Sequence, residues 1–140
     1  MLLLCSATRA TSATAGEAAV RAFVDSIKSV AQVKQGIREA LTEAEQCGTG
    51  HCWNFHASQI CDLTAALDVR VGYAITGTFE NAKRSIQISD ADLRLMKLIF
   101  SQCKPSNYQY WNYSQLLHVI YDPSPKVAAQ VNKLLGIKKN

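Results

Sequence analysis

The spacing of apolar side chains predicts that most of this chain is helical. Between residues 16 and 46, apolar residues recur at three- and four-residue steps, which is the period of one helix face. Val20 and Phe23 begin this stripe and should face the core. Gly36 weakens helix propensity in the middle of the segment. We therefore expect either one bent helix or two helices joined near Gln35–Gly36.

The middle of the chain has less regular patterns. Residues 47–55 contain Gly48 and Gly50 and predict a loop. Residues 57–82 fit a helical period, but part of this segment also alternates at period two with Val, Ile, Tyr and Thr, which favour strands. A short hairpin around residues 69–88 is therefore the alternative to a helix here.

Two later helices have recognisable ends. Ser89 precedes two carboxylates and an apolar stripe, which predicts an N-cap followed by an acidic first turn. Ser124 and Pro125 suit the N-cap and first position of a last helix, and Gly136 suits its end. Residues 108–121 form a further amphipathic segment between them.

The predicted fold class is therefore all-α, a small helical bundle held together by disulfide bonds. An α+β fold with the short hairpin around residues 69–88 is the alternative. The 140 residues, 48% hydrophobic and 19% charged, are typical of one globular domain and exclude a wholly disordered chain. No apolar run approaches the ~18 residues that span a bilayer.

The charge distribution argues against a nucleic-acid partner. The formal net charge is +4, from 15 basic and 11 acidic residues. The basic residues are dispersed, and only Lys83–Arg84 and Lys138–Lys139 are adjacent pairs. A nucleic-acid-binding protein would show a basic stripe or a known motif, so these residues are expected to be mostly solvated faces that keep the domain soluble. The charge still leaves room for a mildly acidic protein partner.

The first fifteen residues differ from the rest and suggest a signal peptide. They combine a short apolar start with Ser, Thr and Ala, and contain no acid. Ala13-Thr14-Ala15 fits a signal-peptidase site, with cleavage before Gly16. The apolar stretch is short, as expected if the start of the chain is truncated or misplaced. We thus expect residues 1–15 to be removed on export and residues 16–140 to form one helical domain.

The cysteine count then indicates disulfide bonds. If Cys5 leaves with the signal peptide, Cys47, Cys52, Cys61 and Cys103 remain. An even number in a small exported domain predicts two disulfides, and four cysteines allow three pairings. We favour one local bridge within residues 47–61 and one long bridge to Cys103.

A zinc site is the alternative use of these cysteines. Cys47, Cys52, His56 and Cys61 are of the ligand types that zinc prefers. Four residues separate the first two cysteines, however, whereas zinc knuckles favour two. The main prediction is therefore that the protein holds no metal and no other cofactor, and that His51 and His56 are surface residues.

The sequence contains no recognisable catalytic constellation. It has no Gly-x-Ser-x-Gly, no glycine-rich phosphate loop and no His-Glu-x-x-His. The prediction is that the protein is not an enzyme. Two non-enzymatic functions fit these features: a small exported helical ligand-binding protein and a zinc-dependent interaction module.

The order of short motifs in the C-terminal half resembles one bacterial family. Gly72-Tyr73 is followed by Cys103-x-Pro105 and, after an amphipathic segment, by a break at Pro123 and a last helix. This order resembles the immunity proteins that protect bacteria against peptidoglycan amidases delivered by type VI secretion. Val71 stands where that family often has a cysteine. The resemblance implies a periplasmic, disulfide-bonded helical protein that binds and blocks an amidase effector and forms a homodimer.

Composition suggests where such a partner would bind. Residues 104–113 are polar but contain four aromatic side chains, and Tyr and Trp are frequent interface hot spots. The predicted partner-binding residues are Lys104, Tyr108, Tyr110 and Trp111. Trp111 is the one of these with the stronger tendency to pack into the core.

Overall fold

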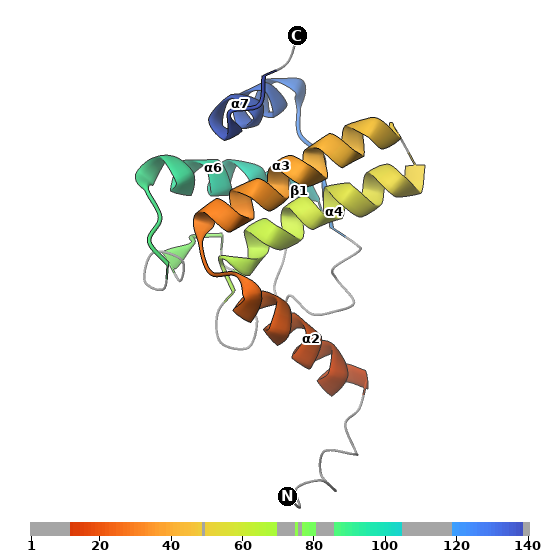
Figure 1. Cartoon of the computed structure of the whole chain (residues 1–140), viewed down its shortest axis with the longest axis vertical. Coiled ribbons are helices and arrows are strands. Elements are labelled where there is room, and N and C mark those ends of the chain that lie inside the picture. Colours follow the sequence, from red (N-terminus) through yellow and green to blue (C-terminus); the bar gives the residue numbers. More distant parts are fainter. Residues whose placement is uncertain are drawn as a thin grey trace, which may run out of the picture.

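The computed structural model describes residues 12–48, 50–69, 75, 77–80, 86–104 and 119–138, with side chains from Ala18 onward except that of Val20. It confirms the predicted all-α fold (Figure 1). A two-stranded antiparallel sheet accompanies the helices. The elements are α2 (Ser12–Ser26), α3 (Val30–Cys47), α4 (Gly50–Ala66), α6 (Asp90–Phe100), β1 (Cys103–Lys104), β2 (Ile120–Tyr121) and α7 (Pro125–Leu135).

The helices α3 and α4 form a close antiparallel hairpin at the centre of the molecule (Figure 1). Gly48 and Gly50 have φ of 87° and 81°, a conformation that glycine adopts without steric cost. They allow a turn so tight that α4 begins at Gly50. The loop predicted for residues 47–55 is therefore wrong, because its second half is the first turns of a helix.

The joint between the first two helices lies before the position that was predicted. The α2 helix ends at Ser26 and α3 begins at Val30. The Ser29 hydroxyl accepts a hydrogen bond from the Gln32 backbone N–H at 3.1 Å, and the Gln32 side chain accepts one from the Lys28 backbone N–H at 2.8 Å. These two bonds satisfy one backbone donor in the first turn of α3 and one just before the cap.

Gly36 serves close packing rather than a bend. It lies inside α3, where a Cβ atom would come within 2.9 Å of Leu63 Cδ1 on α4. Its missing side chain therefore lets the two helices of the hairpin approach each other. The predicted joint at Gln35–Gly36 is wrong for this reason.

The predicted start of α6 and both predicted ends of α7 are confirmed, whereas α6 ends at Phe100, before Cys103, which was expected on its apolar face. Ser89 accepts from the Asp92 backbone N–H at 3.1 Å, and Ser124 accepts from that of Val127 at 3.3 Å. Gly136 ends α7 in the left-handed conformation. The core enclosed by these helices is apolar; its fully buried members include Val33, Ile37, Ile60, Leu67, Phe79, Leu95, Met96, Ile99 and Val131.

Strand pairing occurs where it was not expected. The strands β1 and β2 pair Cys103 with Tyr121 and Lys104 with Ile120. The end of the helical segment predicted over residues 108–121 is thus a strand. Around the predicted hairpin at residues 69–88, the described residues contain one isolated bridge, between Val69 and Ile75.

A buried carboxylate organises the segment after α4. Asp68 is fully buried, and its side chain accepts hydrogen bonds from the backbone N–H groups of Gly77 and Phe79, the latter at 2.8 Å. Phe79 has a φ of 59° and packs edge-on against Phe100, with ring centroids 5.9 Å apart. The carboxylate therefore fixes a backbone conformation that side chains rarely adopt.

The phenol of Tyr121 should make the stability of the fold sensitive to alkaline pH. Burial raises its pKa from 10.0 to about 12, because desolvation disfavours the phenolate. The unfolded chain therefore loses this proton at lower pH than the folded chain. We expect the free energy of unfolding to fall as the pH rises from 10.0 to about 12, as measured by urea denaturation.

Tyr121→Phe is the matched control for this effect, since it removes the hydroxyl and keeps the ring. The variant should lose less stability than the parent protein over the same pH interval. Equal losses in both proteins would contradict the assignment of the effect to Tyr121.

In the part of the chain that is described, no helix is both long enough and apolar enough to cross a membrane. The α2 helix runs across the cleavage point predicted before Gly16. Cleavage there would remove its first residues, so processing of residues 1–15 stays a prediction.

Candidate functional site

Two disulfide bonds join the four cysteines that the structure describes. Cys47 at the end of α3 is bonded to Cys52 in the first turns of α4, and Cys61 within α4 is bonded to Cys103 in β1. The Cα atoms are 5.7 and 5.9 Å apart. This is the expected division into one local and one long bridge. It removes Cys61 from the alternative zinc site.

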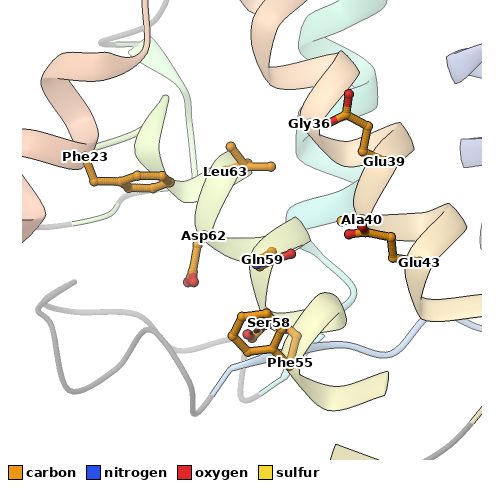
Figure 2. A pocket seen from close by; sticks show the side chains of 10 residues that line it. All are labelled: Phe23, Gly36, Glu39, Ala40, Glu43, Phe55, Ser58, Gln59, Asp62 and Leu63. Atoms are coloured by element: carbon orange, nitrogen blue, oxygen red, sulfur yellow. Dashed lines mark hydrogen bonds between the residues drawn. The ribbon is translucent and has the colours of Figure 1, made fainter. Parts of the chain in front are cut away.

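A cleft of about 420 Å³ lies along the α3–α4 hairpin. Its lining side chains come from both helices, and Phe23 reaches into it from α2 (Figure 2). We call it the hairpin cleft, lined by Phe23, Gly36, Glu39, Ala40, Glu43, Phe55, Ser58, Gln59, Asp62 and Leu63.

The hairpin cleft combines an apolar floor with carboxylates. Phe23 and Leu63 are partly buried against the core, whereas the Phe55 side chain is 50% exposed. Glu39 and Glu43 stand on α3 and are exposed, and Asp62 on α4 is buried. An apolar site with a few charged groups is typical of binding clefts.

A cluster of titratable side chains adjoins one end of this cleft. His56 Nδ1 lies 3.3 Å from Glu43 Oε1, and its ring stands edge-on to that of Phe55 at 5.2 Å. A ring nitrogen of His56 and the sulphur atoms of Cys47 and Cys52 lie within 4.8 Å of one another. His56 is thus not the surface residue that was predicted, since its side chain is only 17% exposed. His51 is exposed, as predicted.

The residues predicted to bind a partner are only partly described. Lys104 lies in β1 and is exposed. Tyr108, Tyr110 and Trp111 lie outside the described residues, as do Gly72, Tyr73 and Pro105, which carry much of the family resemblance. Their predicted roles stay predictions.

The hairpin cleft was not identified from the sequence. Its residues come from three helices, and the prediction of a loop at residues 47–55 hid the relation between Phe55 and Leu63. A signal was available only for the adjoining cluster: Cys52 and His56, like Glu43 and Cys47, are four residues apart. That spacing places each pair on one side of a helix, provided that both segments are helical.

In comparisons with known proteins, no family model, no curated protein and no solved structure matches the chain.

Proposed function

We propose that this chain is an exported immunity protein that binds a cell-wall amidase effector in the periplasm and blocks it, without catalytic activity of its own. The motif order in the C-terminal half supports this role through its resemblance to the immunity family. Two disulfide bonds are also in keeping with an oxidising compartment. The resemblance further implies a homodimer.

The observation that carries a binding role is the half-exposed Phe55 on the hairpin cleft. Exposed aromatic side chains beside a concave surface are typical of interface hot spots. Within the described residues, Phe55 and Leu134 are the large hydrophobic side chains with substantial exposure, at 50% and 43%. Only Phe55 borders the cleft.

The charge of the cleft indicates what the partner would insert. Glu39 and Glu43 line it from one side of α3, four residues apart, although the chain as a whole carries a net charge of +4. Glu39 accepts a hydrogen bond from the neutral Gln35 amide at 3.1 Å. A lysine or arginine of the amidase would place its charge at these carboxylates and its aliphatic stem against Phe55 and Leu63.

The test is inhibition of the type VI peptidoglycan amidases encoded in the same genome, measured as hydrolysis of purified peptidoglycan. Phe55→Ala should weaken inhibition about tenfold or more, the effect of losing one hot-spot side chain. Its melting temperature should change little, because half of the side chain is already in water. Leu134→Ala is the matched control, since Leu134 is similarly exposed but lies on α7.

Two results would separate the parts of the proposal. If the parent protein inhibits none of these amidases, the immunity function is wrong. If it inhibits one, but Phe55→Ala behaves like Leu134→Ala, the hairpin cleft is not the binding surface. The double variant Tyr108→Ala/Tyr110→Ala then tests the aromatic segment that the sequence suggested, with loss of inhibition as the expected result.

The volume of the cleft favours one other function, that of a small-ligand carrier. About 420 Å³ lies within the ~300–1,000 Å³ of small-molecule sites. Native mass spectrometry of the purified protein distinguishes the two. A carrier would retain a small molecule that Phe55→Ala releases, whereas an immunity protein would not.

A further inference from the structure

The closed end of the α3–α4 hairpin has the arrangement of a metal site. Glu43 and Cys47 are four residues apart on α3, and Cys52 and His56 are four residues apart on α4. Each pair therefore lies on one side of its helix. The tight turn at Gly48 folds the helices back, so that the cysteines meet at the turn and Glu43 meets His56.

Small side-chain movements would give this cluster the spacing of a tetrahedral site. Zinc bonds of ~2.3 Å to sulphur and ~2.0 Å to nitrogen place neighbouring ligand atoms about 3.5–3.8 Å apart. In the structure, the ligand atoms of Cys47, Cys52 and His56 lie within 4.8 Å of one another. Rotation of the side chains closes the remaining difference once the two sulphur atoms are no longer bonded.

Glu43 acts as the positioning residue for His56. His56 Nδ1 lies 3.3 Å from the Glu43 carboxylate and 3.3 Å from the side-chain oxygen of Gln59. Both oxygens are acceptors, so Nδ1 carries the hydrogen and Nε2 keeps the lone pair that a metal needs. Histidine ligands in metal sites commonly donate their other N–H to a carboxylate in this way. Cys61 has no part in the cluster, because it is bonded to Cys103.

We propose that the Cys47–Cys52 bond gates a zinc site, in which Cys47, Cys52 and His56 bind one Zn²⁺ when the bond is reduced. A dithiol reductant supplies two electrons and two protons and is itself oxidised to a disulfide, so that both cysteines become thiols. Zn²⁺ then displaces the two thiol protons and binds two thiolates and the imidazole. Water fills the fourth position.

Burial makes this reduction selective. Cys52 is exposed and Cys47 half-buried, whereas Cys61 and Cys103 are fully buried in the core. Thiol–disulfide exchange requires the attacking thiolate to reach a sulphur atom. The hairpin bond therefore opens first, and the buried bond keeps the fold in place.

The experiment uses the full chain with Cys5→Ser, so that the fifth cysteine does not contribute. The protein is treated briefly with a dithiol, freed of reductant without oxygen, and titrated with Zn²⁺ alone by calorimetry. Alkylation and peptide mass mapping of a second sample identify the free thiols. We expect free Cys47 and Cys52, an intact Cys61–Cys103 bond, one Zn²⁺ per chain in the reduced protein and none in the oxidised protein.

Variants of the cluster test the ligand assignment. Glu43→Gln should weaken Zn²⁺ binding about 10- to 100-fold, the range for groups that orient a ligand, and His56→Gln should weaken it further. Co²⁺ should give a thiolate charge-transfer band that His56→Gln changes. His51→Gln, a neighbouring exposed histidine on the same helix, should leave binding unchanged.

The proposal is overturned if the selectively reduced protein binds no Zn²⁺, or if His56→Gln and His51→Gln bind it equally well. It is also overturned if the oxidised protein binds Zn²⁺ as tightly as the reduced one, or if Cys61 and Cys103 are alkylated together with the other pair. None of these results bears on inhibition of an amidase, which is measured on the oxidised protein.

Discussion

Replacing Cys61 and Cys103 together by alanine is expected to lower the free energy of unfolding by about 4 kcal/mol, since their bond closes a loop of 42 residues. The bond connects the buried face of α4 to the strand that follows α6. Without it, the unfolded chain gains the conformational freedom that the bond removes. Both sulphur atoms lie in the core, so the alanine variant also loses packing contacts. Urea denaturation under non-reducing conditions measures the difference.

The double variant Cys47→Ala/Cys52→Ala is the matched control. Its bond spans only 5 residues, for which the same relation gives about 2 kcal/mol. The hairpin bond also lies at an exposed turn, where little packing is lost. If the hairpin variant loses as much free energy of unfolding as Cys61→Ala/Cys103→Ala, or more, then loop length and burial do not determine which bond stabilises the fold more.

Replacing Asp68 by alanine is expected to cost about 3 kcal/mol, because two backbone N–H groups lose a charged acceptor. These are the donors of Gly77 and Phe79. Phe79 is fully buried. Without the hydrogen bond to its backbone N–H, this core side chain is held in place less firmly. Hydrogen exchange of the two amides should accelerate along with the global loss measured by urea denaturation.

Two further variants make this test specific. Asp68→Asn keeps one carbonyl oxygen and should cost less than Asp68→Ala. Asp25→Ala removes an exposed carboxylate from α2 and should change stability by no more than about 0.5 kcal/mol. If Asp68→Ala is no more destabilised than Asp25→Ala, the carboxylate does not support the Phe79 segment.

The helix ends that were predicted correctly all depend on local chemistry. Ser89, Ser124 and Gly136 act through hydrogen bonds or backbone angles within one turn of the helix, so a single sequence contains the needed information. Ser29 with Gln32 is a signal of the same kind that was overlooked. It would have placed the first helix joint correctly, because it follows the Ser-x-x-Gln pattern of a capping box.

The errors arose where a residue serves a distant contact. Gly36 was interpreted as a bend, but its neighbour across the hairpin, Leu63, is 27 positions later in the chain. Gly48 and Gly50 were interpreted as part of a loop over residues 47–55. In the structure α3 ends at Cys47 and α4 already begins at Gly50. In both cases composition indicated weak helix propensity, and packing of α3 against α4 outweighed it.

The candidate sites show the same division. The four cysteines and their even count predicted the disulfide bonds, and the ligand types around residues 47–61 predicted metal chemistry as an alternative. Which residues take part depended on pairing: Cys61 belongs to the core bond, and Glu43 joins His56 instead. The hairpin cleft had no local signal, since Phe55 and Phe23 approach it from different helices.

The sequence by itself determined the helical class, the capped start of α6, both ends of α7, and the presence of disulfide bonds, because periodicity, capping and cysteine count are local or compositional properties. The tertiary structure alone decided where α3 and α4 meet, which cysteines pair, and which side chains line the cleft and form the cluster of Cys47, Cys52 and His56. These features depend on contacts between residues far apart in the chain. The apolar surface that such contacts bury contributes more free energy than the helix propensities of single residues.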